Sequence, residues 1–252
     1  VVCNVLNLAV DDGALPVNPS HRLGRIIREK SLKLVADPLT REELAALLNT
    51  FREHFPRHYP MALTLARTGM RLGEAMALQW GDIDFHGRFI NVQRNISKGI
   101  VGTPKSGKSR RVDMSRQLAE TLWHLRNQRR IETLQKGWGQ VPKWVFISET
   151  GTSLIEHHWR VRVYAKALEK AGLRRIRIHD LRHTYASLLI QAGESLAYVR
   201  DQLGHHSIKV TVDIYGHLAP EGNKAAVDRL DDDATIRNLS ATKTEKDSAA
   251  VS

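Results

Sequence analysis

The feature that most constrains the fold is a change of hydrophobic periodicity along the chain. Over residues 40–79, and again from Ser115 onward, apolar residues recur every three or four positions, which is typical of amphipathic helices. Between these regions, residues 83–93 carry aromatic and β-branched residues on both sides of a His-Gly turn, which predicts a β-hairpin, and residues 110–114 predict a third short strand. The pattern therefore predicts an α+β fold, predominantly helical, with one small antiparallel sheet.

Caps and apolar spacing set the bounds of the expected elements. Thr40 and Glu43 form a capping box, in which a hydroxyl and a carboxylate satisfy free backbone N–H groups at a helix start. The helix that follows carries apolar residues at helical spacing from Leu44 to Phe51. Residues 143–148 predict a short strand or an extended stretch. Further helices are expected at about residues 60–68, 72–79, 115–130, 156–171, 180–192, 195–203 and 207–216.

Three parts are expected along the chain. Residues 1–36 comprise the end of an apolar helix and a linker that contains prolines and a basic run; because the chain begins with Val, we expect an upstream part to be missing. A new domain opens at Asp37-Pro38-Leu39-Thr40 and is expected to cover residues 37–222. Residues 223–252 form a tail with little apolar surface to bury.

Net charge indicates a class of partner. The 252 residues include 38 Lys and Arg against 27 Asp and Glu, a formal net charge of +11, and the tail is slightly acidic, so the positive charge lies in the body of the chain. A basic body is typical of proteins that bind polyanions such as nucleic acid, although an ordinary basic protein would have the same balance. The only cysteine, Cys3, excludes an internal disulfide and a cysteine-based zinc site. A reduced, cytoplasmic setting is expected, and no stretch is apolar enough for a membrane helix.

Polar side chains are concentrated in four segments. In the first, RLGE at 71–74, Arg71 and Glu74 are three residues apart and share one helix face. An arginine at a helix start opposes the helix macrodipole, so its position is locally unfavourable and suggests a function. A surface ion pair would give the same spacing.

The second segment, TPKSGKSRR, surrounds a flexible turn. It contains Lys105, Lys108, Arg110 and Arg111. A hairpin tip of this kind can bring a lysine to a phosphate, and it can equally be a solvated basic loop.

The third segment is HDLRHT at 179–184. His179 and Arg182 share one helix face, and His183 follows four residues after His179, close to the H-E-x-x-H zinc motif with Asp180 in the glutamate position. A zinc site of the extended type would need a third ligand three or six residues after His183, where alanine and leucine stand. The cationic Arg182 would also repel the metal, so we expect neither a metal nor a cofactor.

The fourth segment, LGHHSIKVTVDIYGHL, joins two helices. Gly204 ends one helix and Ser207 can cap the next, so His205 lies in the bend and Tyr215 lies near the end of the second helix. A tyrosine at such a position is ordinarily a core aromatic.

Together the four segments resemble the tyrosine recombinases of the phage integrase family. RLGE (71–74), HDLRHT (179–184), LGH (203–205) and DIYGH (213–217) occur in the family's order and spacing, from about Asp37 to Leu218. The resemblance implies an integrase-like, DNA breaking–rejoining domain, preceded by the last helix and linker of a truncated core-binding domain. Carried over position by position, it implies six catalytic residues: Arg71, Lys105, His179, Arg182, His205 and Tyr215.

The resemblance also implies how the phosphate is held. Arg71 and Arg182 would clamp the non-bridging oxygens of a phosphodiester with a charge that does not titrate away, which makes a metal ion unnecessary. His205 would add a donor to the same oxygens, and Glu74 would buttress the first arginine.

The implied proton transfers involve three further groups. Tyr215 would attack phosphorus and form a 3′-phosphotyrosyl link with a free 5′-hydroxyl, and the cationic groups would favour its phenolate form. His179 would accept or donate the proton, and Lys105 would protonate the 5′-oxygen.

The resemblance implies a site-specific recombinase or integrase, with double-stranded DNA as partner and four protomers acting on two duplexes. Three alternatives remain open at this stage: a catalytically silent DNA-binding regulator of the same fold, a type IB topoisomerase-like enzyme and a metallohydrolase. The complete set of catalytic residue types argues against the regulator, and the LGH and DIYGH contexts favour the recombinase over the topoisomerase.

Overall fold

The computed structural model describes residues 2–22, 37–104 and 107–218, and the chain divides into two compact units, Val1–Asp37 and Pro38–Ser252. In the first unit, α1 (Val2–Asp11) is followed by the 3-10 turn η1 (Pro19–Arg22). The side-chain amide of Asn18 joins the two by donating to the Cys3 carbonyl oxygen at 3.1 Å. The helix expected at residues 1–10 is therefore present, whereas its assignment to a truncated domain stays a prediction. The expected tail, residues 223–252, lies outside the described residues.

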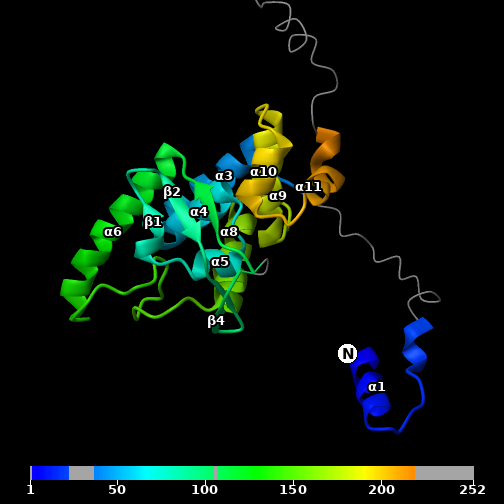
Figure 1. Cartoon of the computed structure of the whole chain (residues 1–252). Coiled ribbons are helices and arrows are strands. Elements are labelled where there is room, and N and C mark those ends of the chain that lie inside the picture. The colour runs from blue at the N-terminus through cyan, green and yellow to red at the C-terminus, as the bar shows by residue number, and fades with distance from the viewer. Residues whose placement is uncertain (1, 23–36, 105–106, 219–252) are drawn as a thin grey trace, which may run out of the picture. The chain divides into compact units, whose positions relative to one another are not determined.

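The second unit is mostly helical with a small antiparallel sheet, which confirms the predicted fold class (Figure 1). Among the described residues, no helix has both the length and the apolar character needed to cross a membrane. The longer helices are α3 (Arg41–His54), α4 (Tyr59–Thr68), α6 (Arg116–Lys136), α9 (Ile178–Gln191), α10 (Leu196–Leu203) and α11 (Ile208–Tyr215). The shorter segments are η2 (Pro56–His58), α5 (Leu72–Met76), η3 (Trp80–Asp82), α7 (Glu156–His158), η4 (Trp159–Tyr164), α8 (Ala165–Lys170) and η5 (Gly216–Leu218).

The predicted sheet is present and contains three strands in the order β1-β2-β5, all antiparallel. They are β1 (Ile83–Asp84), β2 (Phe89–Val92) and β5 (Arg110–Asp113). Ile90 of β2 lies opposite Val112 of β5, and both side chains are fully buried, so this register turns one face of the sheet to the core.

A second hairpin, formed by β3 (Asn95–Ser97) and β4 (Ile100–Gly102), was not expected from the sequence. Its place beside α5 depends on Gly73, because a Cβ at that position would lie 2.3 Å from the Ile96 carbonyl oxygen. The glycine of the RLGE segment therefore allows the close approach of helix and hairpin.

Three expected elements differ from the structure, one of them because α6 ends at Lys136 and not at about residue 130. Residues 143–148 form no strand, and Trp144 makes only an isolated bridge to Gln79. The helix α5 ends at Met76 and not at residue 79, because Gln79 forms that bridge and the 3-10 turn η3 follows it.

The helix α3 contributes to the main core, and its predicted capping box is confirmed. Thr40 Oγ1 accepts from the Glu43 backbone N–H at 3.2 Å, and Glu43 Oε2 accepts from the Thr40 N–H at 2.8 Å. Phe51 of α3 stacks on Trp159 of η4, with ring centroids 6.2 Å apart and an angle of 12° between the planes. The helix expected at 156–171 is present and contains η4 as a π-helical turn.

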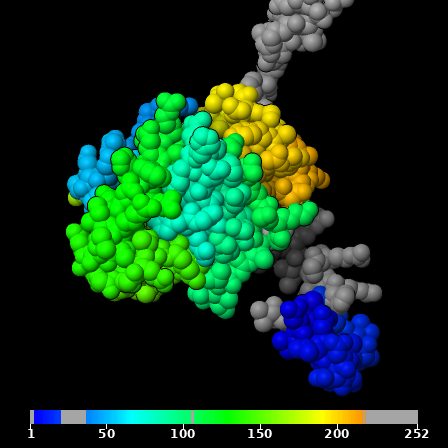
Figure 2. All heavy atoms as spheres, turned by 60° about the vertical axis from the view of Figure 1, so that its left-hand side comes forward, coloured from blue at the N-terminus to red at the C-terminus, as the bar shows by residue number. Residues whose placement is uncertain are grey.

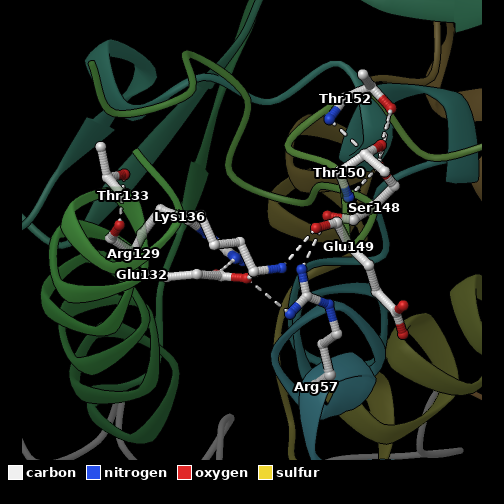
Figure 3. Close-up of polar contacts among 9 residues, drawn as sticks. All are labelled: Arg57, Arg129, Glu132, Thr133, Lys136, Ser148, Glu149, Thr150 and Thr152. Atoms are coloured by element: carbon white, nitrogen blue, oxygen red, sulfur yellow. Dashed lines mark hydrogen bonds and ion pairs between the residues drawn. The ribbon is translucent and has the colours of Figure 1, made fainter. Parts of the chain in front are cut away.

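A polar cluster fastens α6 to its neighbours (Figure 3). Arg129, which is buried, forms an ion pair with Glu132, and the same carboxylate contacts Arg57 of η2 at 3.1 Å and Lys136 at 3.4 Å. Arg57 also donates to the Ser148 carbonyl oxygen at 2.8 Å. Burial alone would raise the pKa of Glu132, but Arg57 and Arg129 hold it below its ordinary value. Glu132 is thus the shared anion of three cations.

A smaller apolar cluster is formed by α9, α10 and α11, which lie next to one another in Figure 1 and form one continuous region, coloured yellow to orange, in Figure 2. Its buried members are Tyr185, Ala186, Ile190, Val199, Leu203 and Tyr215. The cluster brings α11 against α9, so the polar residues of both helices lie close together.

Candidate active site

Arg182 of α9 connects three of the four polar segments. Its side chain is buried, and its guanidinium donates to the Gly69 carbonyl oxygen at 2.7 Å and to the Leu203 carbonyl oxygen at 2.5 Å. Gly69 precedes the RLGE segment, and Leu203 begins the LGH segment. Arg182 therefore holds the start of α5 and the end of α10 against α9, while three of its five N–H groups have no acceptor within the described parts of the chain.

The charge of Arg182 is affected by its surroundings. Burial, followed by repulsion from Arg71 and Arg110, lowers its pKa to about 9. The group remains a cation at neutral pH, and an anion placed next to it would be strongly attracted.

Glu74 of α5 is a buried carboxylate between two arginines. The Arg71 side chain donates to Glu74 Oε1 at 2.8 Å, and Arg110 of β5 donates to both carboxylate oxygens, at 3.1 and 2.7 Å. Burial would raise the pKa of Glu74, but the hydrogen bonds and charge of Arg110, together with those of Arg71, lower it to about 2. The predicted Arg71–Glu74 pair is thus present as part of a three-residue network.

Arg110 was expected beside a flexible turn, at the start of the strand predicted over residues 110–114, and the structure places it at the start of β5 with its side chain largely buried. Its Nε donates to the Gln202 carbonyl oxygen at 3.0 Å, and its Cδ would lie only 2.5 Å from a Cβ at Gly204. Arg111, the next residue, lies over the ring of Phe89 with its guanidinium carbon 3.9 Å from the ring centroid. Arg110 is therefore a structural neighbour of the site, whereas Arg111 packs on β2, and both lie on a strand and not in a loop.

His205 lies in the bend between α10 and α11, as predicted. Its Nδ1 is 2.9 Å from Thr211 Oγ1, which fixes the ring. Burial, followed by the nearby Arg182 and Arg71, lowers its pKa to about 4. His205 is therefore a neutral ring beside both predicted arginines.

His179 and His183 stand one turn apart on α9. Their rings meet edge to face with centroids 5.1 Å apart. Loss of water around the ring, and then the neighbouring His183 and Arg182, lower the pKa of His179 to about 4. His179 also lines a cleft of about 680 Å³ together with Arg71 and three further arginines, Arg160, Arg175 and Arg177.

Tyr215 is the last residue of α11, and only 2% of its surface is exposed. Its hydroxyl oxygen lies 2.6 Å from His183 Nδ1. The cationic Arg182 favours the phenolate as expected, but burial outweighs it and raises the pKa of Tyr215 to about 12. The effect of the cation is thus in the expected direction, but with this pKa Tyr215 is a phenol at neutral pH.

The structure brings five of the six predicted residues together: Arg71, His179, Arg182, His205 and Tyr215. Lys105 lies outside the described residues. Two neighbours of the site, Arg110 and His183, were named in the polar segments of the sequence but were not among the predicted catalytic residues. The signal for Arg110 was strand alternation, because it shares a face with the buried Val112. The signal for His183 was its position one turn after His179.

No group of three or more histidine, cysteine or carboxylate side chains suited to a metal ion occurs among residues 2–22, 37–104 and 107–218. His179 and His183, the pair with the zinc-like spacing, contact each other edge to face. In this structure His183 also contacts the Tyr215 hydroxyl.

Comparison with known proteins identifies the family to which this chain is similar. Residues 37–221 match the model of the Phage integrase family. The chain is 32% identical over 247 residues to a "Tyrosine recombinase XerC-like" protein of Caldanaerobacter subterraneus subsp. tengcongensis, and 30% identical over 236 residues to the ICEBs1 integrase of Bacillus subtilis. Each alignment covers 90% of this chain and 62% of the relative, so the chain spans less than two thirds of their length.

A solved structure shares the fold. The Tn1549 transposon integrase, in complex with a circular intermediate DNA, superposes with a TM-score of 0.69 at 18% identity, covering 90% of this chain and 76% of that one.

Proposed function

The chain belongs to the phage integrase family, and from this premise we propose that it is a site-specific DNA recombinase that cleaves and rejoins DNA through a 3′-phosphotyrosyl intermediate. The observation that carries the proposal is the convergence on α9. Arg182 is bonded to the segments that precede Arg71 and His205, and the adjacent His183 contacts Tyr215. A nucleophile, two guanidinium groups and neutral imidazoles thus meet at one place.

The proposed role of the arginines is to neutralise the phosphate. Charge accumulates on the non-bridging oxygens when a phosphodiester is attacked, and catalysis depends on preorganised donors and cations around them. Arg182 is held by backbone carbonyls and Arg71 by Glu74, so neither guanidinium must reorganise when the phosphate arrives. His205 adds a neutral N–H donor beside them.

Tyr215 is the proposed nucleophile. Its attack on phosphorus forms an ester that keeps the free energy of the broken phosphodiester, so a 5′-hydroxyl of another strand can reverse the step without ATP. Lys105 is proposed, from the family resemblance alone, as the acid that protonates the leaving 5′-oxygen.

Double-stranded DNA is the proposed partner. The net charge of +11 and the arginine-lined cleft beside Arg71 and His179 support binding to a phosphate backbone. The Tn1549 integrase, which shares the fold, was solved with DNA. We also propose that four protomers act on two duplexes, that residues 1–36 belong to a core-binding domain and that residues 37–222 are the catalytic domain.

The experiment is covalent capture on a nicked "suicide" DNA substrate that carries the recombination site, in the presence of EDTA. The wild-type chain is expected to form a protein–DNA adduct that survives denaturing electrophoresis, because the proposed chemistry needs no metal. Tyr215→Phe should bind the DNA and form no adduct, and Tyr59→Phe is the matched control that should behave as wild type. DNA binding without any adduct would favour the silent regulator, and relaxation of supercoiled DNA without strand exchange would favour a topoisomerase-like enzyme.

A further inference from the structure

Between α9 and α11, the Tyr215 hydroxyl contacts His183, a histidine to which the family resemblance assigns no role. His183 Nδ1 lies 2.6 Å from Tyr215 Oη, and the two rings are tilted by 51° with centroids 5.7 Å apart. The implied proton-transfer residue, His179, makes no hydrogen bond with Tyr215 in the described part of the chain. It faces the arginine-lined cleft instead.

We propose that His183 is a catalytic residue whose Nδ1 accepts the hydroxyl proton of Tyr215 as Oη attacks the scissile phosphorus. This inference rests on the proposed function. The two histidines then have separate roles: His183 acts on the nucleophile, and His179 acts on the phosphate side of the site.

The surroundings of His183 suit a proton acceptor. Burial lowers the pKa of His183, which favours a neutral ring at neutral pH. In the tautomer that carries its proton on Nε2, the Nδ1 lone pair accepts from the Tyr215 hydroxyl. Asp180, one turn earlier on α9, acts in the opposite direction and stabilises the imidazolium once the proton arrives. Asp180 is itself held by Arg177, which donates to its two oxygens at 3.0 and 2.6 Å.

A buried phenol needs such an acceptor. Tyr215 is almost fully shielded from water, so bulk hydroxide has little access to its hydroxyl. Other titratable or charged groups also act on this site, so the pH dependence of cleavage reflects all of them together. The groups that face the His183–Tyr215 pair are His179, Asp180 and Arg182 of α9, Arg177 before α9 and His205 before α11.

In cleavage the bond between Tyr215 Oη and phosphorus forms, the bond between phosphorus and the 5′-oxygen breaks, and the hydroxyl proton passes to His183 Nδ1. The 5′-oxygen takes its proton from a separate acid, the role proposed for Lys105. In ligation the 5′-hydroxyl attacks, and the His183 imidazolium returns its proton to the departing Tyr215 oxygen.

The test is single-turnover cleavage of the suicide substrate by His183→Asn from about pH 6 to about pH 9. Asparagine keeps a polar group near the Nδ1 position but cannot take up the proton. We expect DNA affinity to stay within about threefold of wild type and cleavage near pH 7 to fall about 100-fold, in line with the usual contribution of general base catalysis. The defect should shrink as the pH rises, because a growing fraction of Tyr215 is then already ionised and needs no base. His124→Asn, an exposed histidine of α6, is the matched control and should leave the rate unchanged.

Three outcomes would overturn the inference. A wild-type rate and pH profile for His183→Asn, or a loss that is equal at every pH, would remove the proton-acceptor role while the Tyr215 adduct upheld the proposed function. A wild-type chain that forms no adduct would overturn both.

A second measurement needs neither DNA nor a variant of His183. In ¹⁵N spectra of the histidine rings near pH 7, His183 is expected to carry its proton on Nε2, with an unprotonated Nδ1 whose chemical shift changes in Tyr215→Phe. A protonated Nδ1 in the wild-type chain would refute the inference, because that nitrogen could not accept from the tyrosine.

Discussion

Replacing Glu74 by glutamine tests whether the buried carboxylate organises the arginines of the site. Glu74 is 1% exposed and accepts hydrogen bonds from Arg71 and Arg110. These partners overcome the effect of burial and lower its pKa from 4.5 to about 2. Because a tenfold change in proton affinity corresponds to about 1.4 kcal/mol, the charged carboxylate contributes about 3 kcal/mol to the free energy of unfolding at neutral pH. Glu74→Gln should lose about that amount, since a neutral amide leaves two guanidinium groups without their anion.

The pH dependence of this loss follows from the direction of the pKa change. A carboxyl group whose pKa is lower in the folded chain stabilises the fold above its unfolded pKa, and the stabilisation disappears as the pH falls through the folded value. The difference between wild type and Glu74→Gln should therefore be full above about pH 5 and fall below about 1 kcal/mol near pH 2.

Urea unfolding followed by circular dichroism, at several pH values, measures this difference. Glu120→Gln on the exposed side of α6 is the matched control and should change the free energy of unfolding by less than about 0.5 kcal/mol. A difference below about 1 kcal/mol for Glu74→Gln at pH 7, or one that does not change between pH 7 and pH 2, would refute the reasoning.

Three other variants test separate parts of the structure. Gly204→Ala should lower the free energy of unfolding by at least about 2 kcal/mol, because its φ of +66° disfavours a side chain and the new Cβ would lie 2.5 Å from Arg110 Cδ. Gly172→Ala is the matched control: its φ is +65° but the space around it is open, so it should lose only about 1 kcal/mol in the same thermal or urea assay. Glu132→Gln should destabilise the fold by about 2 kcal/mol, because a buried arginine loses its anion, and an unchanged melting temperature would contradict the role given to this cluster. Arg182→Lys should bind DNA within a few-fold of wild type yet cleave at least about 100-fold more slowly, because a lysine supplies charge without the fork that reaches Gly69 and the phosphate together; cleavage at the wild-type rate would exclude the clamp.

Local sequence signals predicted most of the fold. The capping box at Thr40 and the glycine at the end of α10 placed helix boundaries correctly, because each satisfies backbone groups through its own side chain or its own φ. The β3–β4 hairpin escaped prediction because its strands have three residues each and Ile100 and Val101 are exposed, so no alternation of buried and exposed positions marks them. Its position beside Gly73 is a tertiary contact that periodicity does not report.

The candidate site was predictable as a set of residues but not as a network. Order and spacing identified Arg71, Arg182 and Tyr215. That Glu74 also pairs with Arg110 depends on the tertiary position of β5, which spacing does not report. The protonation state of Tyr215 also depends on burial, because the same cations that favour the phenolate are outweighed by the loss of water around the ring. Spacing along a chain contains no information on either.

Identification of the residue that becomes attached to DNA tests the central claim most directly. Trypsin cleaves after Lys209 and Lys224, so the peptide from 210 to 224 contains Tyr215 as its only tyrosine. After reaction with the suicide substrate, nuclease trimming and mass spectrometry, this peptide is expected to carry the mass of a 3′-linked phosphonucleotide on Tyr215. The same modification found on a peptide with a different tyrosine, or an adduct that lacks a tyrosine–phosphate bond, would contradict the account.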